Sequence, residues 1–249
     1  MKKQIAIATS TYYCGGMEVR YHLALQALEQ YRQLGYPVFL VDDTVGDLGG
    51  TVRDKFRRLG ATIFSTEVGG GVMGQDRRTA IRMAVESGAD LIVWAEPEKL
   101  LAHFIAGILR QSEADLIIVG RQSLESYPSH QRLCEETGNR EAAVYTGRRD
   151  LDLWFGPRIF TTEAARFFLD YNGEYGDVWD SIFIPAVRAI ADRTLRVESV
   201  TVPYTYPLEQ AQQEEGDHAF ITRRNYQLKV LHDAIREECT KLGLYTEPS

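Results

Sequence analysis

Residues 69–99 read GGGVMGQDRRTAIRMAVESGADLIVWAEPEK, and this stretch decides the fold more than any other part of the chain. It predicts, in order, a glycine-rich loop, a helix over 75–87 that carries arginines, a buried strand over 90–96, and two carboxylates one residue apart. A loop that lets the backbone approach a phosphate would then lie beside a strand end with oxygen ligands for a cation. The stretch therefore favours an α/β enzyme that handles a nucleotide.

The composition is that of an ordinary globular protein. The chain has 249 residues, enough for one large α/β domain, of which 44% are hydrophobic and 25% charged. A formal net charge of −7 argues against nucleic acid as the main partner, because a phosphate backbone requires a basic face. The sequence contains no run of about 18 apolar residues, so we expect no membrane span.

The cysteines and the first residues indicate the compartment. Cys14, Cys134 and Cys239 are far apart and form no CxxC pair, so neither a zinc site nor a disulfide framework is expected. The opening MKKQIAIATSTYY has only a short apolar run, which predicts the first strand of the fold rather than a secretory signal. We therefore expect a protein of the reducing cytoplasm.

The first half of the sequence alternates short apolar runs with helical periodicity. Apolar runs separated by helices predict a mainly parallel sheet with helices on both faces. Gly35, Gly60 and Gly88 each follow a predicted helix, where glycine is a frequent C-terminal cap. The predicted strands are 5–9, 38–43, 61–65, 90–96 and 115–120, and the predicted helices are 17–34, 51–59, 75–87 and 99–112.

The pattern changes after residue 120. A polar, irregular segment covers 121–149, and a long helix is predicted at the C-terminal end. We predict a single domain over 1–249, with a nucleotide-binding half up to residue 120 and an acceptor half over 121–249. In the second half the predicted helices are 138–145, 162–169, 178–191 and 222–242, and the predicted strands are 155–160 and 195–202.

Ligands of parallel α/β sheets collect at the carboxyl ends of the strands, so residues there are the first candidates for a site. Thr9 and Tyr12 follow the first strand, and Asp42-Asp43 follows the second. Acidic residues at such ends bind ribose hydroxyls, whereas an aspartate in the turn DDTVGD could equally cap a helix. Polar strand ends are also common simply because loops are polar.

The glycine-rich loop ends at Gly74 and leads into a basic helix. The loop does not match GxxxxGK[ST], which excludes a P-loop. Its glycines would still let the backbone approach a ligand closely, and Arg77 or Arg78 could reach a phosphate. Arg82, further along the same helix, fits a solvated face better.

Glu96-Pro97-Glu98 is the sharpest feature of the stretch. At the end of a strand, alternating side chains can direct one carboxylate toward a ligand and the other toward a metal. Magnesium and manganese are held by one or two carboxylates together with substrate phosphates. The alternative is a capped helix start, with Pro97 in the first position and Glu98 in the first turn. That alternative leaves Glu96 unexplained.

These residues resemble the GT-A glycosyltransferases, especially the family-2-like and mannosylglycerate-synthase-like groups. The resemblance rests on IAIATSTYY, on VFLVDD, and on GVMGQDRRTAIRMAVESGADLIVWAEPE at the place of the Asp-x-Asp motif. It implies a GT-A fold, a nucleotide-diphosphate sugar as donor and a divalent metal, Mn²⁺ or Mg²⁺. Glu-Pro-Glu departs from Asp-x-Asp, with longer side chains and a rigid middle residue. The implied donor-site residues are Thr9, Tyr12, Asp42, Gly74, Arg77, Arg78 and Glu96, with Glu98 as the metal ligand.

The second half fits the resemblance more loosely. EYGDVWDS resembles the acidic stretch that supplies the catalytic base of inverting members, which implies Asp177 or Asp180 in that role. Asp177 could instead cap the helix that begins at Val178. His218 occupies the place where some members carry a late metal-binding histidine, although a histidine on a surface loop is the simpler interpretation.

The sequence therefore predicts a glycosyltransferase that moves a sugar from a UDP- or GDP-linked donor to the hydroxyl of a small molecule or a glycan. The leaving diphosphate gains negative charge, which a metal ion and arginines would stabilise. A catalytically inactive module that binds a nucleotide-sugar or a protein is the alternative. A nucleotidyltransferase is disfavoured, because the glycine loop lies before the third helix and not after the first strand. The long C-terminal helix could cover its own sheet or pair with a second subunit.

Overall fold

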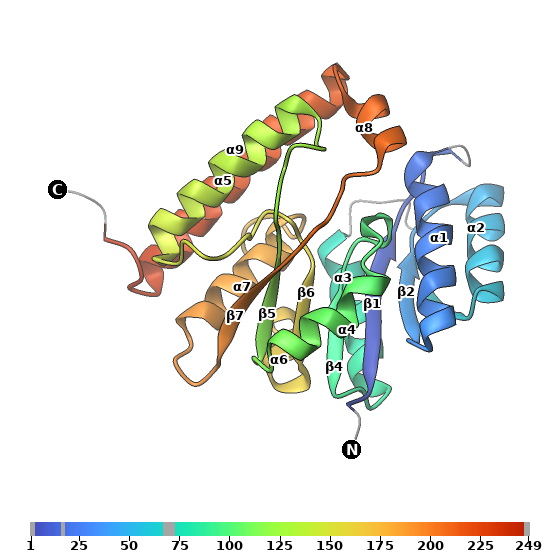
Figure 1. Cartoon of the computed structure of the whole chain (residues 1–249), viewed down its shortest axis with the longest axis horizontal. Coiled ribbons are helices and arrows are strands. Elements are labelled where there is room, and N and C mark those ends of the chain that lie inside the picture. Colours follow the sequence, from blue (N-terminus) through green and yellow to red (C-terminus); the bar gives the residue numbers. More distant parts are fainter. Residues whose placement is uncertain (1–2, 16–17, 67–72, 247–249) are drawn as a thin grey trace.

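The computed structural model describes residues 3–15, 18–66 and 73–246. Its centre is a sheet of seven strands in the order β3-β2-β1-β4-β6-β5-β7 (Figure 1). Within the described residues, neighbouring strands run parallel except where β6 pairs with β4 and with β5. The strands are β1 (Ile5–Thr11), β2 (Val38–Asp42), β3 (Ala61–Phe64), β4 (Leu91–Trp94), β5 (Leu116–Arg121), β6 (Arg158–Thr161) and β7 (Val197–Val202).

Helices cover both faces of this sheet, which confirms the predicted α/β class. Alternate residues of each strand enter different cores: Ala6 and Ala8 of β1 pack into one, and Ile7 packs into the other. Strands buried on both faces read as continuous apolar runs. The helices are α1 (Val19–Leu34), α2 (Gly46–Arg58), α3 (Met73–Glu86), η1 (Pro97–Lys99), α4 (Ala102–Gln111), α5 (Ser129–Thr146), α6 (Thr162–Leu169), α7 (Asp180–Ala191), α8 (Leu208–Glu214) and α9 (His218–Lys241).

The two longest helices, α5 and α9, lie side by side and project beyond the sheet (Figure 1). Both are longer than the sequence pattern predicts: α5 begins at Ser129 and not near 138, and α9 begins at His218 and not at 222. Asp217 explains the second difference, because its side chain accepts hydrogen bonds from the backbone N–H groups of Ala219 and Phe220 and so caps the helix. Helix α8 was not predicted.

Strand β6 brings the second half of the chain into the sheet of the first half. It inserts between β4 and β5, so Arg158 pairs with Trp94 at the carboxyl end of β4. Because β6 runs antiparallel, the loop before it lies at the edge where the parallel strands end. This reversal places residues 153–157 beside Glu96.

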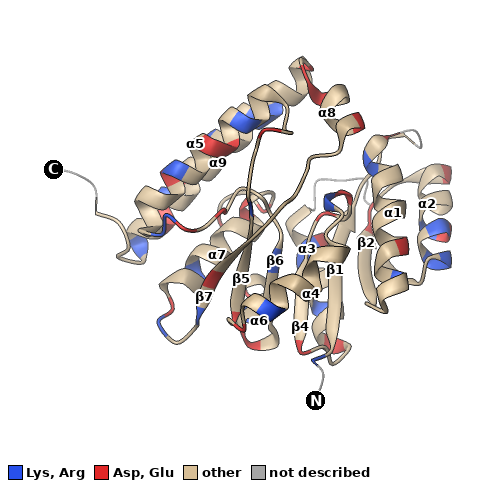
Figure 2. Cartoon of the chain, viewed as in Figure 1, with Lys and Arg blue, Asp and Glu red and all other residues tan. Residues whose placement is uncertain are grey.

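The outer helices carry charged residues of both signs. Figure 2 shows basic and acidic residues interspersed on the outer helices in this view. Among the described residues, none of the helices is both long enough and apolar enough to span a bilayer.

Candidate functional site

Two cavities open at the carboxyl ends of the parallel strands. The first, here called the β1 cavity, is lined by residues 10–14, at the end of β1 and just beyond it, and by Asp76 and Trp94. The second, here called the α9 cavity, is lined by Glu135 of α5, by residues 154–156, and by part of α9. Both lie where α/β sheets bind ligands. The two cavities adjoin and are together called the cleft, because they share Arg20, Met73, Arg77, Glu96, Glu98 and Arg223.

Glu96 and Glu98 lie where the two cavities meet. Glu96 has extended backbone after β4, and Pro97 opens the short helix η1, with Glu98 in its only turn. The helix-start interpretation of this motif therefore holds for the backbone, while both side chains still line the cleft. Oε2 of Glu96 is buried without a hydrogen-bond partner. A buried oxygen of this kind costs free energy unless a ligand satisfies it.

The surroundings of Glu98 differ from those of Glu96. Burial raises the pKa of Glu98, and the positive charge of Arg20 opposes that shift. Burial alone would lower the pKa of Arg20, but the charge of Glu98 and the hydrogen bond to Glu18 raise it. Glu98 is thus already balanced in part by a guanidinium group, and Glu96 keeps an oxygen available.

Gly156 makes room for the Glu96 carboxylate. Its φ is 100°, a region that side chains rarely adopt, and a Cβ added there would lie 2.9 Å from Oε2 of Glu96. The glycine lies in the loop before β6, which the antiparallel strand brings to this edge. A glycine at this position therefore lets the loop close against the carboxylate.

Arg77 lines both cavities, and its guanidinium group also holds the fold. It donates to the carbonyl oxygen of Val178 at 2.8 Å and to Oγ of Ser181 at 3.0 Å, and it lies 5.6 Å from the ring centroid of Trp94. Burial lowers its pKa. Arg77 thus links α3 to the start of α7 beneath the cleft.

Arg78 and Asp177 form an ion pair with two hydrogen bonds, one of them 2.7 Å long. Asp177 has a φ of 59°, and its carbonyl oxygen accepts a hydrogen bond of 2.8 Å from the backbone N–H of Gly74. A Cβ on Gly74 would lie 2.0 Å from Oδ1 of Asp177, so this glycine allows a close approach to protein and not to a ligand. Neither Arg78, Asp177 nor Gly74 lines the two cavities.

Asp180 holds the loop before α7. Its side chain is fully buried and accepts hydrogen bonds from the backbone N–H groups of Asp177 and Val178 and from the hydroxyl of Tyr171. The sequence interpretation as a catalytic base requires an open path to an acceptor hydroxyl, and these three donors occupy the carboxylate. In this structure Asp180 is a buried residue that holds the backbone of residues 177–178.

The residues predicted around a nucleoside separate into exposed and buried groups. Tyr12 is exposed and lines the β1 cavity. Thr9 is buried inside β1 and lies outside the cavity lining. Asp42 is fully buried and accepts hydrogen bonds from Oγ1 of Thr11 at 2.9 Å and Oγ1 of Thr44 at 2.7 Å. Asp42 therefore ties two strand ends together rather than presenting its carboxylate to a ligand.

His218 does not join the carboxylates at the cleft. It is exposed, begins α9 and lies outside the lining of both cavities. The described residues contain no group of three His, Cys, Asp or Glu side chains placed to hold a metal ion. Glu96 and Glu98 still offer carboxylate oxygens to one face of the cleft, a donor set that fits Mn²⁺ or Mg²⁺ if a bound diphosphate completes the coordination. The glycines at 69–71 lie outside the described residues.

The structure adds three cleft residues that the sequence analysis missed: Arg20, Asp76 and Arg223. Asp76 is buried, its Oδ1 has no hydrogen-bond partner, and burial with the nearby charges of Asp43 and Asp42 raises its pKa to about 7. Two sequence features could have pointed to these residues: the adjacent arginines in ITRRN, which include Arg223, and the aspartate before the arginines in GQDRR, which is Asp76. They predict charge on a helix without placing it in a site.

No family model matches the sequence, and no curated protein sequence matches it. Solved structures do share the fold. Staphylococcus aureus TarS has a TM-score of 0.52 at 16% identity over 80% of this chain, which spans only 35% of the TarS chain. A mannosyltransferase from Pyrobaculum calidifontis, solved with GDP-Man and Mn²⁺, has a TM-score of 0.51 at 12% identity over 97% of this chain and 74% of its own.

A nucleotidyl transferase from Methanothermobacter thermautotrophicus is similar to the same degree. Its TM-score is 0.50 at 12% identity, over 88% of this chain and 98% of its own. Identities this low show a shared GT-A-like fold and no more. The reaction class must therefore be argued from the cleft.

Proposed function

We propose that the protein is a glycosyltransferase that uses a nucleotide-diphosphate sugar. The observation that carries this proposal is one cleft with two cavities that meet at Glu96 and Glu98. Transfer between two substrates requires two binding regions that share a reacting centre. The β1 cavity, at the end of the first strand, would take the nucleoside, and the α9 cavity would take the acceptor.

The chemistry of the acceptor side supports a hydroxyl-bearing acceptor. The α9 cavity presents the aromatic rings of Trp154 and Trp179 together with the polar side chains of Glu135 and Gln227. Aromatic faces suit the apolar face of a sugar, and planar polar groups suit its hydroxyls. The acceptor is therefore proposed to be a sugar or another polyhydroxyl compound.

The proposed reaction breaks the bond between the donor sugar and its diphosphate. Negative charge develops on the leaving diphosphate, so fixed positive charge beside it lowers the barrier. A divalent ion held by Glu96 or Glu98 would supply part of that charge when bound. Glu96, with its unsatisfied oxygen at the junction of the cavities, would orient the reacting groups.

Ligand-dependent unfolding tests the proposal. UDP- and GDP-sugars are expected to raise the Tm, because a ligand that binds only the folded state stabilises it by mass action. Release of UDP or GDP is then measured with a panel of sugar and polyol acceptors. Stabilisation without release across the panel would indicate a binding module, and incorporation of a nucleotidyl group would indicate the rival transferase. No Tm shift with any nucleotide-sugar would reject the proposal.

Replacing Gly156 with alanine is expected to impair turnover by displacing the Glu96 carboxylate. The added Cβ would lie 2.9 Å from Oε2 of Glu96, so that side chain must move. A misplaced reacting group can cost about 10- to 100-fold in rate, and we expect kcat/KM to fall by about tenfold or more. Gly147→Ala is the matched control, because Gly147 also has a positive φ, of 70°, but open space around it. Equal turnover in both variants would contradict the role given to Glu96.

A further inference from the structure

Arg20 and Arg223 come from helices that are distant in sequence and meet in the cleft. Arg20 lies in the first turn of α1, and Arg223 lies in the second turn of α9. Both line the β1 cavity and the α9 cavity, and both line a third cavity between the start of α1 and the α8–α9 corner. An anion bound where these cavities join would contact both guanidinium groups.

The aromatic ring of Phe220 orients two of the guanidinium groups in this region. Phe220 is buried, and the Cζ atoms of Arg223 and Arg224 lie 5.6 Å and 4.9 Å from its ring centroid. Arg224 also donates to Oε1 of Gln227 at 2.8 Å, while its Nε is buried without a partner. These contacts hold the two arginines beside the cleft at little further entropic cost on binding.

The positive charge of this group is only partly balanced. Arg20 pairs with Glu18 at 2.7 Å and also faces the charge of Glu98, and the charge of Glu214 acts on Arg223. Among the residues that the structure describes, no carboxylate forms an ion pair with Arg223 or Arg224. Burial and the neighbouring charges of Arg224 and Arg20 lower the pKa of Arg223. Like charges held together in this way favour the binding of an anion.

We propose that Arg20, Arg223 and Arg224 bind the diphosphate of the donor, and that nucleoside diphosphates therefore bind without a divalent ion. This inference rests on the proposed function. Arg77 and Arg78, the arginines predicted for this role, are already engaged by Val178 and Asp177. A guanidinium group can donate two parallel hydrogen bonds to phosphate oxygens, which an ammonium group cannot do with the same geometry.

Calorimetric titration in EDTA tests the inference with UDP, GDP and the corresponding nucleosides as probes. In EDTA the diphosphates are expected to bind at least tenfold more tightly than the nucleosides. Arg223→Gln should weaken diphosphate binding by about tenfold or more and leave nucleoside binding unchanged. Arg20→Gln should act in the same direction. Lys229→Gln, an exposed position on α9 outside the three cavities, is the charge-matched control and should have no effect.

Two results would overturn the inference: loss of diphosphate binding in EDTA, or unchanged binding in Arg223→Gln and Arg20→Gln. Failure of the proposed function is a separate outcome. Sugar turnover that survives in Arg223→Gln, with unchanged diphosphate affinity, would reject the arginine site and keep the glycosyltransferase. The opposite outcome is diphosphate binding in EDTA that Arg223→Gln abolishes, in a protein that turns over no donor. That result would support the arginine site and reject the glycosyltransferase activity.

Discussion

Arg121→Met is expected to lower the free energy of unfolding by about 3–5 kcal/mol, because it removes the cation of a buried network. Arg121 ends β5, and its side chain is almost fully buried. It forms ion pairs with Glu135 and with Asp152, the latter at 2.7 Å. Without the guanidinium group, two carboxylates remain with too few donors, and one of them, Glu135, lies in the wall of the α9 cavity. At about 2–4 °C per kcal/mol for a chain of this size, the Tm should fall by roughly 10 °C.

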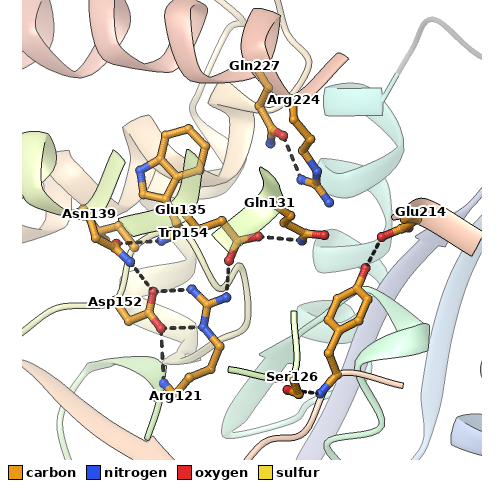
Figure 3. Close-up of polar contacts among 12 residues, drawn as sticks. Arg121, Ser126, Gln131, Glu135, Asn139, Asp152, Trp154, Glu214, Arg224 and Gln227 are labelled. Carbon is orange, nitrogen blue, oxygen red and sulfur yellow. Dashed lines mark hydrogen bonds and ion pairs between the residues drawn. The ribbon is translucent and has the colours of Figure 1, made fainter. Parts of the chain in front are cut away.

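The network also positions residues of the α9 cavity, the proposed acceptor side of the cleft (Figure 3). Asn139 donates to Oδ1 of Asp152 at 2.7 Å and accepts a hydrogen bond from the backbone N–H of Trp154 at 3.1 Å. Gln131 donates to the second oxygen of Glu135 at 2.7 Å. Glu135 and Trp154 line the α9 cavity, so the loss of Arg121 should disturb acceptor binding even where the protein stays folded.

Arg148→Met is the matched control for this prediction. Arg148 pairs with Asp150 at 2.7 Å on the surface, where both side chains are partly exposed, and such pairs contribute about 0–1 kcal/mol. Urea unfolding of both variants measures the difference. Burial would raise the pKa of Asp152, but the hydrogen bonds and the charge of Arg121 lower it below the value in the unfolded chain. The network therefore stabilises the folded state at pH values above the unfolded pKa of Asp152, and this stabilisation is lost in acid. If Arg121→Met lowers the free energy of unfolding by no more than Arg148→Met does, the stabilising role of the buried network is contradicted.

The sheet was predictable from the sequence because burial on both faces leaves a direct mark. Strand residues such as those of β4 and β5 are apolar at successive positions, and glycines follow the helices between them. The boundaries of α5 and α9 were less predictable. The first turn of α5 makes polar contacts with the chain after α8 and with α9. The backbone N–H of Ser129 donates to Glu215 at 2.9 Å, and Nε2 of His130 lies 2.9 Å from Oδ1 of Asn225. A periodicity argument detects the apolar face of a helix and not such contacts.

The cleft was predictable in part. Strand ends are fixed by local sequence, and Tyr12, Glu96 and Glu98, which follow strands, line a cavity at that edge of the sheet. Arg20 and Arg223 meet only because α9 packs back over the sheet, a long-range relation that no local pattern encodes. The antiparallel course of β6, which brings Gly156 to Glu96, has the same origin. The acidic residues Asp42, at the end of β2, and Asp180, at the start of α7, were recognised as polar. However, hydrogen bonds that hold a loop and hydrogen bonds that bind a ligand use the same residue types.

Asp76→Asn is expected to stabilise the protein near pH 8 and to have little effect near pH 4. Asp76 is buried, and burial with the charges of Asp43 and Asp42 raises its pKa from 3.8 to about 7. The folded state therefore binds more protons than the unfolded state between these values, and wild-type stability falls as the pH rises through that window. Three pH units at about 1.4 kcal/mol each set an upper limit of about 4 kcal/mol.

Asparagine matches the shape of the aspartate and carries no charge, so the variant should lose this pH dependence. The measurement is the free energy of unfolding of wild type and variant between pH 4 and 8. Asp54→Asn is the control, because Asp54 is exposed on α2 and its variant should keep the slope of the wild type. A constant difference between wild type and Asp76→Asn across the range would show that the charge of Asp76 carries no cost. Asp76 lines the β1 cavity, costs stability and has an oxygen without a hydrogen-bond partner. A ligand role would explain this cost: on the proposed function, that oxygen accepts a hydrogen bond from the bound nucleoside.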